Sequence, residues 1–283
     1  MQVILIILCT FTSTVESVFK KQYSLKVSGG NWFFNAQASL FALLFFCVTA
    51  GKISFSAAVL PYSVAFAATY ITASVAMFIA IKTGSLAITS LIGSYSLIIP
   101  TFYGFFFLNE KITLFKVFGI AFLLISLFEI RADSREKINK PTAKWIISVI
   151  TGFIANGMCA VIQNAQQRKF SGAQNSNFMI LALLISFAVL LILALIFESG
   201  KIVEAIKKGG VFGAACGLCN GATNLLVMVI IASVASSVFF PVLSAAGLVL
   251  TFIISVLIYK EKFIPRQIAG LACGLVSLVL LNL

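Results

Sequence analysis

The chain has 283 residues, of which 61% are hydrophobic and only 10% are charged, and its formal net charge is +12. Soluble domains carry about 25% charged residues and roughly 45–50% apolar ones, so this composition excludes an ordinary soluble protein and predicts an all-α integral membrane protein. The positive charge does not indicate nucleic-acid binding, because the lysines and arginines gather at the ends of apolar stretches, where they are typical determinants of topology.

Ten apolar stretches have the length of about 20 residues that a spanning helix needs. The first lacks the positively charged start and the small-residue cleavage site of a secretory signal, so we expect it to be a retained span. In chain order they cover about 2–19, 33–50, 57–80, 84–107, 112–130, 143–166, 177–197, 210–231, 234–258 and 264–282.

Two segments of the chain, 67–130 and 218–281, align on one another without a gap. The polar segment 131–142 is a central loop that separates five stretches from five. Because five is odd, the second half enters the membrane in the opposite direction, which predicts two inverted five-helix repeats, 1–130 and 143–283. The alignment places Thr72 on Thr223, Met77 on Met228, Ser85 on Ser236, Glu110 on Glu261, Gly119 on Gly270 and Ser126 on Ser277.

The distribution of basic residues predicts an orientation. The loops after the odd-numbered stretches hold fifteen Lys and Arg residues, and the other loops hold five. The excess of positive charge normally faces the cytoplasm, so this count places both termini on the other side of the membrane.

Each half contains a Glu-bearing hairpin, 107–113 and 258–264, followed by a helix with a glycine, Gly119 or Gly270. In this pattern and in its number of helices the chain resembles the drug/metabolite transporter superfamily, in its ten-helix EamA-type form. The resemblance implies a multi-pass carrier of small metabolites in the plasma membrane. It also implies cytoplasmic termini, which conflicts with the charge count and leaves the orientation open.

Residues for catalysis are scarce. Histidine is absent, Asp133 and Glu136 belong to the central loop, and Glu198 and Glu204 belong to span ends. General acid–base or metal chemistry needs clusters of such groups, so we expect no enzyme, no cofactor and no metal. The pair Cys216 and Cys219 is interpreted as small packing residues. Glu110 and Glu261 begin helices, where a carboxylate is favoured by the helix dipole, so both are expected to be caps.

Glu16 is the one acidic residue clearly inside a span. A carboxylate within the membrane is by default a functional hypothesis, and we predict Glu16 as a group that couples transport to protons. The alternative is a structural ion pair, because Lys20 follows four residues later, in the order that favours a helical pair.

Uncharged polar residues within the spans predict a binding site. Unpaired amides in hydrocarbon cost several kcal/mol, so such residues face other helices, water or a substrate. The alternative is hydrogen bonding between helices. The predicted substrate-binding residues are Tyr70, Tyr95, Asn156, Gln163, Asn220 and Asn224.

These observations favour a secondary active transporter that moves a small polar metabolite, such as an amino acid or a related compound, by alternating access. The alternatives are an uncoupled facilitator or exchanger of metabolites or cationic drugs and, from another class, a non-transporting membrane scaffold or receptor. The expected partners are a small-molecule substrate, the lipid bilayer and protons. No nucleic acid is expected, and the protein is expected to be a monomer or a homodimer.

Overall fold

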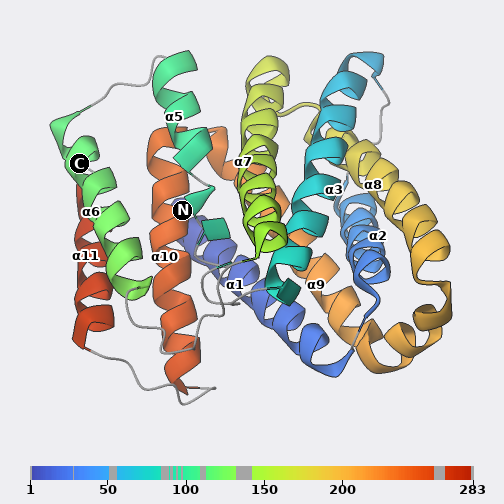
Figure 1. Cartoon of the computed structure of the whole chain (residues 1–283). Coiled ribbons are helices and arrows are strands. Elements are labelled where there is room, and N and C mark those ends of the chain that lie inside the picture. The colour runs from blue at the N-terminus through green and yellow to red at the C-terminus, as the bar shows by residue number, and fades with distance from the viewer. Residues whose placement is uncertain are drawn as a thin grey trace. The chain divides into compact units, whose positions relative to one another are not determined.

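The computed structural model describes residues 2–27, 29–50, 56–83, 89, 92–93, 95–96, 98–108, 113–131, 142–257 and 265–281. Within these ranges the regular structure is entirely helical (Figure 1). The helices are α1 (Gln2–Lys26), α2 (Asn31–Thr49), α3 (Leu60–Thr83), α5 (Ile98–Phe107), α6 (Leu114–Arg131), α7 (Ala143–Phe170), α8 (Asn175–Phe197), α9 (Ile202–Ile231), α10 (Ser236–Leu257) and α11 (Pro265–Leu281). Short 3₁₀ turns at Ala57–Val59 and Ser199–Lys201 precede α3 and α9.

Six helical segments in the described part of the chain are long and apolar enough to cross a membrane. Their outer faces expose large apolar side chains such as Ile147, Phe197 and Val211, as contact with lipid requires. The chain is therefore an all-helical membrane protein. The six segments are Gln2–Ser24, Asn31–Thr49, Ala57–Ala80, Ala143–Phe170, Asn175–Phe197 and Ser199–Ile231.

Helix boundaries extend beyond the apolar stretches where polar residues continue the helix. α1 runs to Lys26 rather than ending near residue 19, and α9 begins at Ile202 rather than near residue 210. Glu204 and Lys208, four residues apart, form an ion pair of 2.8 Å in the first turns of α9, which is the spacing that supports a helix. The predicted caps Glu110 and Glu261, and the loop residues Asp133 and Glu136, lie outside the described residues.

The helices form two compact units. Unit 1 contains Met1–Val75 and Ile162–Ala232, and unit 2 contains Ala76–Val161 and Ser233–Leu283. Each unit takes segments from both halves of the sequence, and α3 and α7 each contribute one end to each unit. The two units are defined by contacts between helices and not by repeats in the sequence. The division into a first repeat (1–130), a central loop (131–142) and a second repeat (143–283) therefore stays a prediction.

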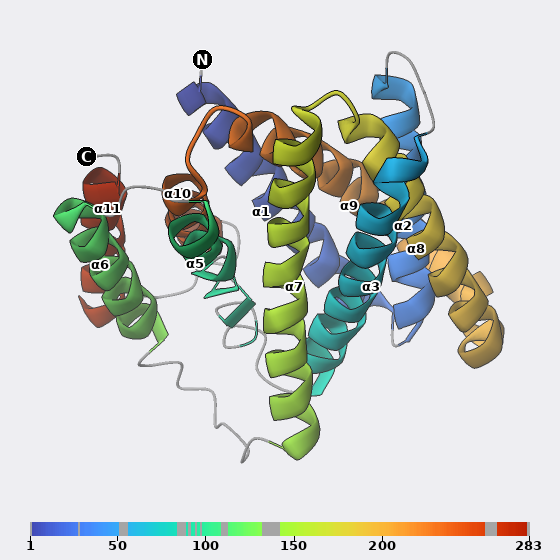
Figure 2. The same cartoon turned by 90° about the horizontal axis from the view of Figure 1, so that it is seen from above.

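In unit 1, α9 packs against both α1 and α2, and α2 also packs against α8 (Figure 2). Four glycines spaced four residues apart line one side of α9, namely Gly209, Gly213, Gly217 and Gly221. A Cβ atom at Gly217 would come within 3.0 Å of the Ala38 carbonyl oxygen, and one at Gly221 would meet the Phe45 side chain at 2.9 Å. The missing side chains therefore let α9 approach α2 closely, as small residues do in membrane helix pairs.

A carboxylate from a distant part of unit 1 caps the beginning of α2. The backbone N–H groups of Asn31, Trp32 and Phe33 donate to the Glu198 carboxylate at 2.8, 2.9 and 3.1 Å. These amides have no partner inside their own helix, and a negative charge there is favoured by the helix dipole. Glu198, predicted only to lie at a span end, thus joins the end of α8 to the start of α2.

In unit 2, α6 packs along α11, and α10 packs against α5 and α11. The Ser277 hydroxyl on α11 donates to the Gly119 carbonyl oxygen on α6 at 2.7 Å. Arg266 and Glu129 join the same two helices by an ion pair of 2.5 Å at the surface. Glycine and serine thus bring these helices together, as they do on α9.

Candidate functional site

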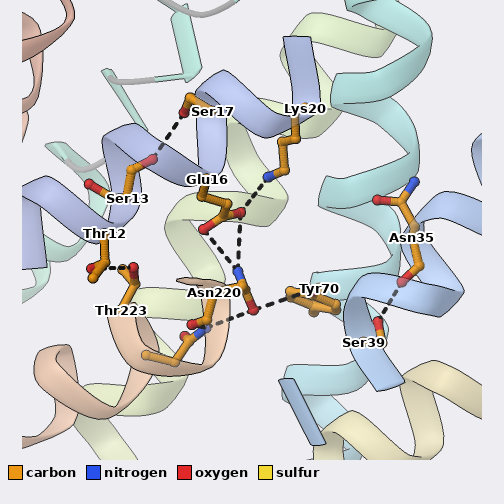
Figure 3. Close-up of polar contacts among 11 residues, drawn as sticks. Thr12, Ser13, Glu16, Ser17, Lys20, Asn35, Ser39, Tyr70, Asn220 and Thr223 are labelled. Atoms are coloured by element: carbon orange, nitrogen blue, oxygen red, sulfur yellow. Dashed lines mark hydrogen bonds and ion pairs between the residues drawn. The ribbon is translucent and has the colours of Figure 1, made fainter. Parts of the chain in front are cut away.

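A buried carboxylate on α1 begins a chain of polar contacts in unit 1 (Figure 3). Glu16 is 8% exposed, and its Oε1 atom lies 2.5 Å from the Lys20 Nζ atom one turn further along α1. The Asn220 amide nitrogen on α9 donates to both Glu16 oxygens, at 3.2 and 3.3 Å. The carboxylate is therefore held by a cation on its own helix and by an amide on a neighbouring helix, which is how buried charges are stabilised.

Asn220 also lies next to Tyr70 and Asn224, and Asn224 connects it to Gln163. Its Oδ1 atom accepts a hydrogen bond from the Asn224 amide nitrogen at 3.1 Å, and the Tyr70 hydroxyl of α3 lies 3.5 Å from the same atom. The Asn224 Oδ1 atom in turn accepts from the Gln163 amide nitrogen of α7 at 2.7 Å. Four helices, α1, α3, α7 and α9, thus contribute to one set of contacts, which we call the Glu16 network (Glu16, Lys20, Tyr70, Gln163, Asn220 and Asn224).

Helical periodicity explains why these residues meet. Glu16 and Lys20, like Asn220 and Asn224, are four residues apart and so lie on one face of their helix. One turn earlier on α1, the Thr12 hydroxyl accepts a hydrogen bond from the Thr223 hydroxyl at 2.8 Å. The polar faces of α1 and α9 therefore remain in register over more than one turn.

The sides of the network differ in their exposure. The Lys20 side chain is 44% exposed whereas that of Glu16 is 10% exposed. Gln163 is buried, and Tyr70, Asn220 and Asn224 are half-buried. The Tyr70 ring stacks on Phe66 with a centroid separation of 5.9 Å, so an aromatic surface borders the amides.

The structure brings together five of the seven residues that the sequence predicts for binding and coupling. Glu16, Tyr70, Gln163, Asn220 and Asn224 share the Glu16 network. The predicted alternatives, an ion pair with Lys20 and hydrogen bonds between helices, are both present in it. These contacts are compatible with either a structural role or a binding role.

Tyr95 and Asn156 belong to unit 2. Asn156 on α7 is exposed, and its amide nitrogen donates to the Ser96 hydroxyl at 2.6 Å, which in turn donates to the Gly93 carbonyl oxygen at 2.6 Å. Tyr95, which directly precedes Ser96, is half-buried. Both residues stay predictions for substrate contact.

Beyond Gln163, the same end of α7 carries amides that the sequence did not lead us to place among the predicted binding residues. Gln166 is fully buried, and neither polar atom of its side chain has a hydrogen-bond partner among the described residues. The side-chain oxygens of Gln167 and Asn175 are also buried without such a partner. Gln163, Gln166 and Gln167 are spaced by three and four residues, which places them on one face of α7. That spacing was the signal that could have found them.

The side chains of the Glu16 network are of the kind that form a polar binding site. Within the described ranges, no three His, Cys, Asp or Glu side chains gather as they would to bind a metal ion. Cys216 is buried and Cys219 is half-buried on α9, and neither forms a disulfide. The network instead provides one carboxylate, one ammonium group, three amides and a phenol, which are groups able to form ion pairs and hydrogen bonds with a polar solute.

Comparisons with known proteins place the fold but not the activity. No protein-family profile matches the chain, and no curated protein matches it. One solved structure, described only as the crystal structure of a protein, aligns with 97% of this chain and 95% of its own at a TM-score of 0.73 and 14% sequence identity. The two chains therefore share a fold over nearly their whole length.

Proposed function

We propose that the protein is a secondary transporter of the drug/metabolite type, which moves a small polar metabolite across the plasma membrane by alternating access. The observation that carries this proposal is the Glu16 network, in which four apolar helices direct a carboxylate, an ammonium group, three amides and a phenol toward one another. Polar groups inside membrane helices are costly and commonly mark the path of a substrate or ion.

Packing within each unit supports the proposed inverted repeats. α2 and α8 are the second helices of the two halves and contact each other, as do α6 and α11, the last helices. A two-fold axis that relates the halves would exchange the members of each pair. The contact of Ser277 with Gly119 has a partial counterpart, because a Cβ atom at Gly274 would lie 2.9 Å from the Ser126 hydroxyl. The aligned residues Ser126 and Ser277 thus both lie at the contact between α6 and α11, each beside a glycine of the other helix.

Each residue of the network has a proposed role. Asn220, Asn224, Gln163 and Tyr70 contact the substrate, since amides and a phenol can both donate and accept hydrogen bonds. Glu16 couples transport to protons, because protonation would remove the charge that holds Lys20. A site with one carboxylate and one ammonium group suits a neutral or zwitterionic metabolite better than a highly anionic one.

One observation favours uncoupled exchange as the second candidate. The Glu16 charge is already neutralised by Lys20 at 2.5 Å, so the network needs no proton to remain stable within the membrane. An exchanger would leave the pH inside vesicles unchanged during flux, whereas a proton-coupled carrier would change it. Loss of that pH change in Glu16→Gln, with flux retained, would assign the coupling to Glu16.

The proposal is tested by a thermal-shift screen of small metabolites against the purified protein. A solute that binds only the folded state raises the apparent stability, by about 2.7 kcal/mol at one hundred times its Kd. We expect at least one polar metabolite to stabilise the wild-type protein and to lose its effect in Asn220→Leu. Thr72→Val is the matched control, because the Thr72 hydroxyl bonds the Ala68 carbonyl oxygen of its own helix. The proposal fails if Asn220→Leu responds to the solute as the control does.

A further inference from the structure

The ion pair at the centre of the network has one fixed member and one free member. Glu16 is held from α9 by the Asn220 amide, at 3.2 and 3.3 Å, and its side chain is 10% exposed. Lys20 is 44% exposed, and among the described residues its side chain makes one polar contact, to Glu16 at 2.5 Å. Lysine carries a compact charge on a flexible stem of four carbons, so Lys20 can leave the pair without any movement of the helix.

The chain contains a second pair with the same spacing but a different environment. Lys208 and Glu204 on α9 are also four residues apart and lie 2.8 Å from each other, with side chains 59% and 45% exposed. An exposed pair contributes little to stability and either member can be solvated alone. A buried carboxylate that stays ionised, in contrast, requires a cation beside it. If Lys20 leaves while Glu16 stays ionised, another cation must take its place.

The surroundings of Glu16 suit an organic ammonium group. The Asn220 amide that donates to the carboxylate carries an Oδ1 atom that accepts from Asn224. The Tyr70 hydroxyl lies 3.5 Å from this Oδ1 atom, and the Tyr70 ring stacks on Phe66. Aromatic faces attract organic cations, and amide oxygens accept hydrogen bonds from ammonium groups. Unit 1 thus offers a carboxylate, an amide oxygen and an aromatic ring, each of which can bind such a cation.

We propose that Glu16 is the binding site for the ammonium group of a ligand, and that Lys20 is a built-in competitor that occupies this site until the ligand displaces it. The inference rests on the proposed function, which it narrows to ligands that carry a positively charged nitrogen. Exchange of one cation for another keeps the buried carboxylate neutralised throughout. Lys20 thereby lowers the affinity for the ligand in proportion to the time that it spends on Glu16.

The test is the binding of tetramethylammonium chloride to the purified full-length protein, followed by thermal shift at constant ionic strength, with tert-butanol as a neutral solute of similar size. In Lys20→Met, which keeps an unbranched side chain without charge, we expect the apparent Kd for tetramethylammonium to fall by roughly tenfold, as for a competitor bound about nine-tenths of the time. Glu16→Gln should remove the response, and tert-butanol should have none.

Lys208→Met is the matched control, because it removes the same charge from a pair with the same spacing, and its Kd should equal that of the wild-type protein. A Kd in Lys20→Met that is unchanged or higher would overturn the proposal, as would an equal change in Lys208→Met.

A second measurement uses the wild-type protein alone. Reductive methylation of Lys20, followed by mass spectrometry, should accelerate when tetramethylammonium is added, and an unchanged rate would contradict displacement.

The outcome is distinguishable from failure of the proposed function. Binding of tetramethylammonium is measured without any flux, so a protein that does not transport can still show the effect of Lys20. Conversely, if a metabolite stabilises the protein through Asn220 while Lys20→Met leaves all affinities unchanged, only the role of Lys20 is rejected.

Discussion

Helix α9 presents two faces to its neighbours in unit 1, and they differ in what holds them. The glycine face (Gly209, Gly213, Gly217 and Gly221) lies against α1 and α2, where a single added carbon would collide with neighbouring atoms. The polar face (Asn220, Thr223 and Asn224) meets α1 and α7 through hydrogen bonds between side chains. The glycine face sets the distance of α9 from its neighbours by close packing. The polar face connects α9 to α1 and α7 by hydrogen bonds, which a solute or a proton can replace.

Under the proposed function, this difference separates the residues of α9 that stabilise the fold from those that bind the ligand. Close backbone approach depends on van der Waals packing, which tolerates no added volume. Hydrogen bonds between side chains can be exchanged for bonds to a ligand with little change in packing. Substitutions on the glycine face should therefore act on folding, and substitutions on the polar face should act on ligand binding.

The largest effect on stability is expected at Gly217. Its added Cβ in Gly217→Ala would approach the Ala38 carbonyl oxygen and the Phe41 Cβ atom, at 2.7 Å from the latter. Because a backbone atom cannot rotate away, α2 and α9 must separate, at a cost of about 3 kcal/mol, the upper end of the usual range for overpacking. The measurement is the thermal unfolding midpoint in detergent.

Gly247→Ala is the control for this change, since a Cβ at this helical glycine meets no atom of the described residues within 4 Å. Alanine is favoured over glycine inside a helix by about 1 kcal/mol, so the control should be as stable as the wild-type protein or slightly more so. Equal midpoints for the two variants would show that the glycine face does not set the spacing of α2 and α9.

A smaller effect, of opposite sign, is expected on α7. Gln166 is fully buried and neither of its side-chain polar atoms is hydrogen-bonded within the described residues. Removing an unsatisfied buried polar group relieves a penalty of about 1–3 kcal/mol, so Gln166→Leu should raise the unfolding midpoint by the equivalent of about 2 kcal/mol. Gln163→Leu, which loses the bond to Asn224, should lower it. A fall in both variants would mean that Gln166 has partners in the folded protein.

The smallest effect is expected at Gly213, on the same face as Gly217. Here the added Cβ would meet the Gln37 amide oxygen within 3.0 Å, and that amide is the end of a flexible side chain. Its nitrogen donates a hydrogen bond to the Gly210 carbonyl oxygen at 2.8 Å. The loss of that bond costs about 1 kcal/mol, and the preference of helices for alanine over glycine offsets about the same amount, so Gly213→Ala should change the stability little. A loss as large as in Gly217→Ala would show that Gln37 cannot move.

The spacing of residues along each helix made part of this site predictable. Asn220 and Asn224 are four residues apart, as are Glu16 and Lys20, and polar residues in apolar spans must find partners. That Asn220 donates to Glu16, 204 residues away, depends on which helices pack together, and one sequence does not contain that information. The four-residue spacing of the glycines was visible and was missed, although it is the usual pattern of close helix contact.

Other features could not be read from residue types. Glu198 was expected only at a span end, and its three hydrogen bonds to the start of α2 require the fold of unit 1 to bring α8 and α2 together. Gln163 and Gln166 are the same residue type on one face of one helix, yet among the described residues the Gln163 side chain has a hydrogen-bond partner and that of Gln166 has none. Their difference arises from the neighbouring helices rather than from their own sequence.

The most direct test of the central claim is flux of the stabilising metabolite into vesicles that contain the purified protein. We predict that wild-type and Thr72→Val vesicles accumulate the metabolite faster than empty vesicles, and that Asn220→Leu reduces this rate at least tenfold, about 1.4 kcal/mol in free energy, while the protein remains folded. Accumulation by Asn220→Leu at the wild-type rate, or none by the wild-type protein, would contradict the assignment of the Glu16 network as a transport site.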